Sequence, residues 1–169
     1  TYQWQSSTEG CNGNFSDIMD ANAISYQPPS LSETTSYRRI VTSTIGMMSC
    51  NDTSNCVIIT VNTVDAGTIG PDQVICNGDI PVTLSAINPA NGAGILTYQW
   101  QESSTGVLGS FSNIMGADNP DFSPPALTDT MYYRRYVTSQ LNMVSCSDTS
   151  NTMVVIINNI TAGTITDDQ

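Results

Sequence analysis

Few residues in this 169-residue sequence are able to carry chemistry. It contains no histidine, and its four basic residues are all arginines. A histidine base, a histidine metal ligand, a Schiff-base lysine and a P-loop lysine are therefore excluded. Among the remaining charged and thiol-bearing side chains are fifteen acidic residues, five cysteines and the arginines.

The carboxylates suggest two kinds of site, a glycosidase pair or a calcium site. They form loose pairs in predicted turns, at Asp17/Asp20, Asp118/Asp121 and Asp167/Asp168. A glycosidase needs two carboxyl groups held across one bond, and calcium takes several oxygen ligands, often from a dedicated loop. The sequence has no EF-hand loop. We therefore expect solvated turn residues, with no catalytic, cofactor-binding or metal-ligating residue and with calcium as the alternative.

The charge balance argues against anionic partners. The formal net charge is -11 at pH 7. Nucleic-acid binding needs a basic surface, and anionic lipids repel an acidic one. The longest apolar run is also far shorter than the roughly 18 residues of a membrane-spanning helix. We expect no nucleic-acid partner and no membrane insertion.

The elements that must position these groups recur along the chain. The pentapeptide TYQWQ at residues 1–5 returns at residues 97–101, an offset of 96 residues. The register then holds without a gap, since YRR recurs at residues 37–39 and 133–135 and DTSN at residues 52–55 and 148–151. A period of this length is too long for a solenoid and matches one small β-sandwich domain.

Short apolar runs bounded by turn residues predict strands rather than helices. Within one period the predicted strands are residues 73–76, 82–86, 96–102, 121–123, 131–139 and 152–158. Gly, Asn, Pro or Asp separates them, and no window has helical periodicity. The spacing resembles an immunoglobulin-like sandwich. We predict an all-β chain of tandem immunoglobulin-like β-sandwich repeats with a period of 96 residues.

The period also sets the predicted domain boundaries. Residues 1–69 form a partial β-sandwich repeat that lacks its first strands, and residues 70–165 form a complete one. Residues 166–169 correspond to residues 70–73 and are the start of a further repeat. The sequence therefore predicts a tandem array.

Six residues are predicted for the structural core of the two repeats: Trp4, Trp100, Tyr37, Tyr133, Arg39 and Arg135. The tryptophans occupy a central-strand position, and the tyrosines lie on the facing late strand. Because neighbouring strand residues point to opposite faces, one arginine of each pair must point inward or to the edge, where it can stack on the tryptophan. Sugar stacking by the tryptophans is the less favoured interpretation.

The five cysteines are predicted to form disulfides rather than a zinc site, because the sequence has neither CxxC nor histidine. Cys76 is expected to bond to Cys146 within the second repeat. Cys11 and Cys56 map to Val107 and Thr152, so both are absent from the second copy, as expected of bonded partners. Cys50 is left unpaired or bridged to an upstream residue, and buried free thiols are the alternative.

These motifs carry a family resemblance over essentially the whole chain. TYQWQSST, FSDIM, a Pro-Pro and Leu turn, SYRRIVTS, a cysteine before DTSN and a β-branched final strand follow one another. The combination resembles the tandem repeats of giant cell-surface adhesins in gliding Bacteroidetes, of the SprB type. The resemblance implies a non-enzymatic module of an extracellular filament or stalk, secreted by the type IX system and serving surface adhesion and gliding motility.

The resemblance also implies partners and a location. The partners would be other repeats of the same long chain, surface polysaccharide or substratum, and the gliding or type IX secretion machinery through regions outside this chain. The location would be the cell surface, with outer-membrane attachment through such regions. Thr130, in the sequence Asp129-Thr130-Met131, matches the short pattern for O-glycans in these bacteria. The alternative function is a carbohydrate-binding or accessory β-sandwich domain of a secreted enzyme.

Overall fold

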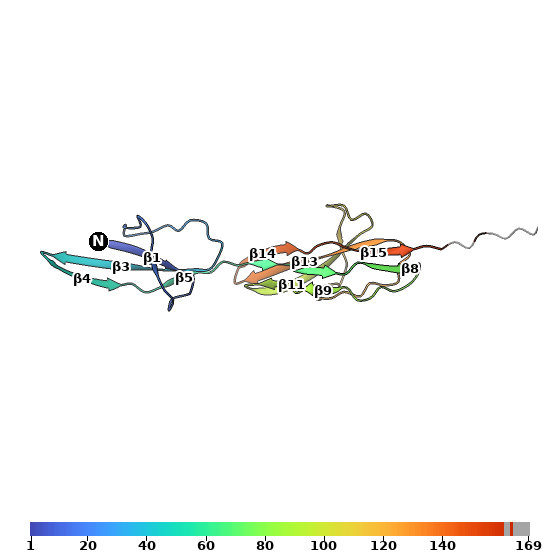
Figure 1. The fold of residues 1–169 in the computed structure, drawn as a ribbon, viewed down its shortest axis with the longest axis horizontal. Coiled ribbons are helices and arrows are strands. Elements are labelled where there is room, and N and C mark those ends of the chain that lie inside the picture. The colour runs from blue at the N-terminus through green and yellow to red at the C-terminus, as the bar shows by residue number, and fades with distance from the viewer. Residues whose placement is uncertain (161–162, 164–169) are drawn as a thin grey trace, which may run out of the picture. The chain divides into compact units, whose positions relative to one another are not determined.

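The computed structural model describes residues 1–160 and residue 163. Over these residues the chain is all-β and has no helix (Figure 1). It divides into two compact units, Thr1–Val61 and Asn62–Gln169, called here the first and the second unit. The predicted repeat boundary at Gly70 follows the sequence period, whereas residues 62–69 pack with the second unit. The predicted start of a further repeat at 166–169 lies outside the described residues.

The first unit contains one five-stranded sheet. Its strands are β1 (Tyr2–Ser7), β2 (Ser16–Asp17), β3 (Thr35–Ile45), β4 (Met48–Thr53) and β5 (Val57–Ile59). The order is β2-β1-β3-β4, and β5 pairs with the start of β3. All of these pairs are antiparallel, so the long strand β3 is the centre of the unit.

The second unit contains a six-stranded sheet and two small two-stranded ones. Its strands are β6 (Val64–Asp65), β7 (Thr68–Gly70), β8 (Gln73–Cys76), β9 (Ser85–Asn88), β10 (Asn91–Gly92), β11 (Ile95–Ser103), β12 (Ser112–Asn113), β13 (Met131–Leu141), β14 (Val144–Thr149) and β15 (Met153–Asn158). The large sheet has the order β12-β11-β13-β15-β8, and β14 pairs with β13. The pair of β15 with β8 is parallel. The small sheets join β10 to β6 and β7 to β9.

The central strand β13 buries every second residue. Tyr133, Arg135, Val137 and Ser139 are buried, whereas Arg134 and Thr138 are only partly covered and Tyr136 is exposed. This is the period-2 pattern of a strand with one face toward a core. Arg135 thus shares the inward face with an aromatic and an aliphatic residue.

Two predicted strands differ from the observed ones, and the longest of the strands that were not predicted is β14. Residues 121–123 form only a single bridge, between Phe122 and Leu84, and β9 begins at Ser85 instead of residue 82. The strand β14 was missed because its residues are mostly polar and exposed. A two-residue turn joins it to β13, with Asn142 at φ 54°, the left-handed conformation that such hairpin turns require.

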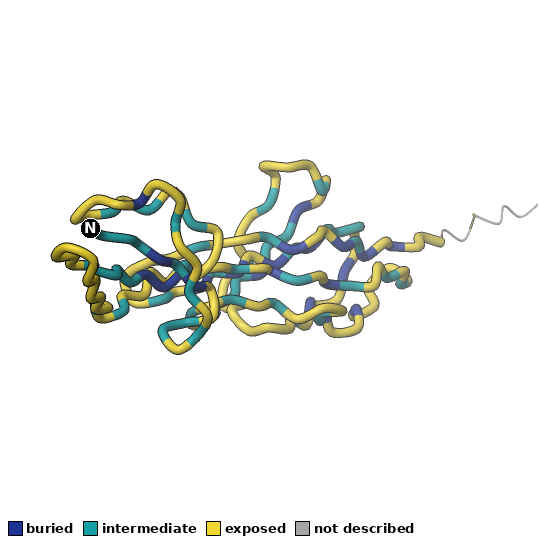
Figure 2. The backbone as a smooth tube through the Cα atoms, turned by 60° about the vertical axis from the view of Figure 1, so that its left-hand side comes forward, coloured by how far each residue is buried: buried dark blue, intermediate teal, exposed yellow. Residues whose placement is uncertain are grey.

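The second unit holds most of the buried apolar residues; Figure 2 colours the backbone by burial. Its core cluster contains Ile69, Leu84, Trp100, Ala117, Leu127, Tyr133, Met153, Val155 and Ile157. In the first unit the strand β5 is largely exposed, with Val57 at 56% and Ile58 at 51%. The second unit therefore has a closed core, and the first unit leaves an apolar strand in solvent.

Candidate functional site

The segment of residues 62–72, called here the connecting segment, lies along the second unit. Its short strands β6 and β7 pair with β10 and β9. Side chains of the region from β13 to β15 also bind its backbone. The site is therefore a docking site for a piece of chain, built from polar side chains that bind peptide groups.

The first anchor of the connecting segment is Asn62. Its Nδ2 donates to the carbonyl oxygens of Ser139 at 2.8 Å and Val144 at 3.0 Å. In return, Ser139 Oγ donates to Asn62 Oδ1 at 2.8 Å, and Cys146 Sγ donates to the Asn62 carbonyl at 3.4 Å. Asn62 thus bridges β13 and β14 close to the turn that joins them.

The second anchor is Ala66, which is completely buried. Its amide donates to Asp148 Oδ2 at 2.9 Å, and its carbonyl accepts from Arg135 Nη2 at 3.0 Å. A carboxylate and a guanidinium group therefore satisfy both backbone polar groups of one residue. Charged partners form stronger hydrogen bonds than neutral ones, which compensates for the burial of this backbone.

The third anchor is Ile69, which is 1% exposed and belongs to the core cluster. Asn151 binds both its backbone groups, since Oδ1 accepts from the Ile69 amide at 2.7 Å and Nδ2 donates to the Ile69 carbonyl at 2.9 Å. Further along, Asp72 Oδ1 accepts from the Val154 amide at 2.9 Å. The side chain of Ile69 and its backbone are thus fixed together.

Gly67 is the position in the connecting segment that requires glycine. Its φ is +67°, and a Cβ built there would lie 2.3 Å from the carbonyl oxygen of Asn88. The obstacle is backbone of β9, which cannot move aside like a flexible side chain. The close approach of the connecting segment to β9 therefore depends on this glycine.

Arg135 is the electrostatic centre of the site. Only 1% exposed, it donates from Nη1 to the Pro120 carbonyl at 2.6 Å as well as to Ala66. Its guanidinium lies 5.2 Å from the ring of Tyr98 and 5.9 Å from that of Trp100. Burial lowers the pKa of Arg135, and Tyr98 and Asp121 oppose that shift. The side chain is a buried cation supported by two carbonyls and two aromatic faces.

The six core residues predicted from the sequence are buried to different degrees. Trp100, Tyr133 and Arg135 are at most 1% exposed, and Tyr37 is 6% exposed. Trp4 and Arg39 are only partly buried, although the Arg39 guanidinium lies 5.7 Å from the Trp4 ring. The stacking of arginine on tryptophan occurs in both units, but only in the second does a closed core surround it.

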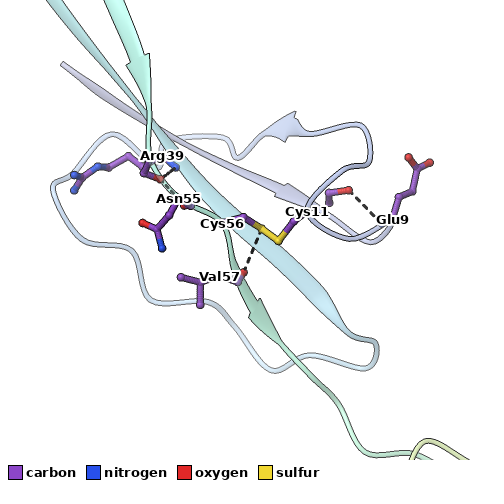
Figure 3. Close-up of a disulfide and its surroundings, with 8 residues drawn as sticks. Glu9, Cys11, Arg39, Asn55, Cys56 and Val57 are labelled. Carbon is purple, nitrogen blue, oxygen red and sulfur yellow. Dashed lines mark hydrogen bonds between the residues drawn. A yellow bond between two sulfur atoms is a disulfide. The ribbon is translucent and has the colours of Figure 1, made fainter.

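One predicted disulfide is confirmed, between Cys11 and Cys56 (Figure 3). Cys11 lies in the loop between β1 and β2, and Cys56 directly precedes β5. The bond closes a sequence separation of 45 residues. It ties the loop after β1 to the strand β5, within the unit that lacks a closed core.

The predicted bond between Cys76 and Cys146 is wrong, because both are free thiols. Cys146 pairs with Ser139 near the end of β13, whereas Cys76 lies beside Asn158, beyond the other end of that strand. At about 3.3 Å per residue, this register separates them by on the order of 30 Å, far more than a disulfide spans. Cys50 is also free and exposed.

The remaining candidate residues serve local structure. Thr130 is partly buried, and its Oγ1 accepts from the Ile157 amide at 3.1 Å; its glycosylation stays a prediction. Asp17 Oδ1 accepts from Gln5 Nε2 at 2.7 Å. Among residues 1–160 and 163, no three Asp, Glu, Cys or His side chains come together as a metal site. Asp167 and Asp168 lie outside the described residues.

Sequence reasoning missed the docking residues Asn62, Asp148 and Asn151. Two side chains of the DTSN motif at residues 148–151 reach the connecting segment, 82 residues away in the sequence. The usable signal was that DTSN is unchanged in both copies. A turn of purely local purpose tolerates other Asx and Ser/Thr combinations.

No helix in the described part of the chain is long and apolar enough to cross a membrane.

Comparison with known proteins places the chain in a family. No curated protein matches the sequence. A family described as a domain of unknown function, DUF8696, matches it in two stretches, residues 1–63 and 65–159. Since these stretches cover nearly all of the sequence, the chain belongs to the DUF8696 family.

Proposed function

We propose that this chain is a non-enzymatic repeat module of an extracellular adhesin filament or stalk, serving surface adhesion and gliding motility. The observation that carries the proposal is the docking of the connecting segment on the second unit. Side chains of that unit bind the backbone of Asn62, Ala66 and Ile69, and the Asn62 side chain is bound as well. A segment held in this way transmits force into the unit that follows it.

The finer description of the fold belongs to the same proposal. We infer that the two units are immunoglobulin-like β-sandwich repeats with a period of 96 residues. Hydrogen bonds recur at that offset: Arg38 Nε donates to Gln5 Oε1 at 2.7 Å, and Arg134 Nε to Gln101 Oε1 at 2.7 Å. Repeated units of this kind supply reach, and interactions between neighbours propagate along the array.

The location and partners follow from the adhesin role. The chain would lie at the cell surface, attached to the outer membrane and to the gliding or type IX secretion machinery through other regions. Its disulfide is typical of an oxidising compartment. Trp100 is completely buried and is therefore not free to stack on a sugar, which favours a structural module over a carbohydrate-binding one.

Antibodies against the purified chain test the proposal. Applied to intact cells of the source organism, they should label the surface, and the label should move along gliding cells. Deletion of the gene should abolish gliding and reduce attachment to glass. Labelling that requires permeabilised cells would contradict the location, and normal attachment and gliding of the deletion strain would contradict the function.

A further inference from the structure

The first unit carries a second copy of the docking site. The residues that hold the connecting segment are Arg135, Ser139, Cys146, Asp148 and Asn151, and 96 residues earlier stand Arg39, Ser43, Cys50, Asp52 and Asn55. All five pairs are identical in type. The first four of the earlier set line a groove of about 430 Å³, and Asn55 lines a neighbouring one of about 320 Å³ that shares Arg39. The groove therefore presents the same donors and acceptors in solvent.

The polar groups of this groove are only partly used. Asp52 Oδ1 accepts from the amide of Thr53, its neighbour, whereas Asp148 binds a distant segment. Arg39 Nη1 donates to the Ile24 carbonyl as Arg135 Nη1 donates to the Pro120 carbonyl, but among the described residues Arg39 has no counterpart of the bond from Arg135 Nη2 to Ala66. The guanidinium group of Arg39 corresponds to that of Arg135, which binds the Ala66 carbonyl. It can therefore donate to a further carbonyl.

An apolar surface adjoins the polar groove. Val57 is 56% and Ile59 39% exposed, whereas Met153 and Val155 at the corresponding positions of the second unit are at most 1% exposed. There the side chain of Ile69 belongs to the cluster that covers them. In the connecting segment, Ile69 stands three positions after Ala66, which binds Asp148 and Arg135. A segment that fills the groove of the first unit therefore needs an aliphatic residue at the same spacing.

The chain contains a second segment with this sequence. Residues 62–69 read NTVDAGTI, and residues 158–165 read NNITAGTI. The asparagine anchor, the alanine anchor and the isoleucine anchor of the connecting segment are all present, at Asn158, Ala162 and Ile165. Residues 161–162 and 164–169 lie outside the described residues.

We propose that the groove of the first unit binds residues 158–169 of a second copy of this chain, so that copies add head to tail. Asp52 and Arg39 would take the amide and carbonyl of Ala162, and Asn55 would take those of Ile165. The donor and the receiving surface are different parts of the chain, so the contact is heterologous and leaves both ends open for further copies. This inference is independent of the proposed function, because it concerns the purified chain alone.

The charge of the chain sets the conditions for this association. Each copy carries a net charge of -11, so two copies repel each other at low ionic strength. Salt screens such repulsion within about 10 Å at 0.1 M. The dissociation constant should therefore fall as sodium chloride rises from 10 mM to 300 mM, the opposite of an interface held by exposed ion pairs.

Sedimentation velocity over a range of chain concentrations tests the proposal. The expected result is a concentration-dependent series of dimers and larger oligomers, and its loss in a chain that ends at residue 160. Asp52→Ala combined with Asn55→Ala should weaken association at least about tenfold, as expected for the loss of three hydrogen bonds. Glu33→Gln, on an exposed residue of the same unit, is the control and should leave association unchanged.

A synthetic peptide with the sequence of residues 158–169 provides the second measurement. It should bind the chain that ends at residue 160 and inhibit association of the full chain, while a scrambled peptide does neither. Circular dichroism and an intact Cys11–Cys56 bond verify that the variants are folded. A peptide that does not bind overturns the groove as a docking site. A peptide that binds a chain that remains monomeric overturns the second copy as its occupant.

Discussion

The two inward-facing arginines show how one residue type acquires two roles. Arg39 and Arg135 both stack near a tryptophan, and the Nε of each is buried and has no hydrogen-bond partner among the described residues. Arg135 is buried and binds Ala66, whereas Arg39 is partly exposed. A buried cation must be held by partners because its desolvation is costly. The contribution of the arginine is therefore set by whether a segment covers it.

Substitution of each arginine by methionine should separate these roles. Arg135→Met leaves the buried carbonyls of Ala66 and Pro120 without a donor, and we expect it to lower the free energy of unfolding by about 3 kcal/mol. Arg39→Met should cost about 1 kcal/mol, because water reaches that site. Urea denaturation of the two variants measures both, and equal losses would contradict the difference in burial.

Tyr133 provides a pH test of the core. Burial, with a smaller contribution from Glu102, raises the pKa of Tyr133 to about 12. The folded state then holds the proton more tightly than the unfolded chain, whose tyrosine pKa is about 10. The contribution of the protonated Tyr133 to the free energy of unfolding is therefore fully present below pH 10. About 2–3 kcal/mol of it is lost as the pH rises toward 12.

The matched variants for this test are Tyr133→Phe and Tyr136→Phe. The hydroxyl of Tyr133 is buried without a hydrogen-bond partner among the described residues, so Tyr133→Phe should keep the fold and remove most of the alkaline loss. Tyr136 is 37% exposed, and Tyr136→Phe should retain that loss. Denaturation at pH 9 and pH 11.5 distinguishes them; an unchanged pH dependence in Tyr133→Phe would assign the loss to other groups.

At the scale of elements, the connecting segment is held by side chains and not mainly by strand pairing. Its strands β6 and β7 are two and three residues long, too short to be stable alone. Asn62, Asp148, Asn151 and Arg135 supply the remaining contacts. The order of the connecting segment should therefore depend on single side chains.

Hydrogen exchange of the Ile69 amide should report this dependence. In the native chain that amide donates to Asn151 Oδ1, so Asn151→Ala should raise its exchange rate about tenfold to a hundredfold, as expected for about 1–3 kcal/mol. Amides at the centre of β13 should change less. Asn55→Ala, the matching change in the first unit, should leave Ile69 protected, and a loss of protection there would contradict the assignment.

The elements visible in the sequence were those with an apolar period. β8, β11, β13 and β15 carry alternating apolar or aromatic residues and were predicted to within a few residues. The strand β14 is exposed and polar, and β6 and β7 are too short to have a period. The error at Cys76 and Cys146 has the same origin: strand assignments give no register, and register decides which cysteines meet. The Cys11–Cys56 pair was predicted because its joint absence from the second copy needs no register.

The disulfide should matter for the first unit alone. Closing a loop with a sequence separation of 45 residues contributes about 4 kcal/mol in the chain-entropy account. Cys11→Ala combined with Cys56→Ala should therefore unfold the first unit at a much lower urea concentration. The second unit contains neither cysteine, so the unfolding of its Trp100 environment, followed in a Trp4→Phe background, should stay the same.

At the scale of the whole molecule, the two units differ in how much apolar surface they remove from water. The second unit encloses a cluster built around Trp100, Tyr133 and Val155. In the first unit, Val57, Ile58 and Ile59 of β5 are all exposed. Apolar burial is the main source of folding free energy, at about 25 cal/mol per Å². The units are therefore expected to have unequal stability despite their similar sequences.

Calorimetry of the full chain should accordingly show two thermal transitions. The first unit should unfold at the lower temperature, because the stabilisation from its disulfide makes up for only part of the apolar burial that it lacks. Reduction should shift the lower transition alone, whereas Arg135→Met should shift the upper one alone, since Cys11–Cys56 and Arg135 belong to different units. A single transition that moves with both changes would show that the units unfold together, and that the closed core of one stabilises the other.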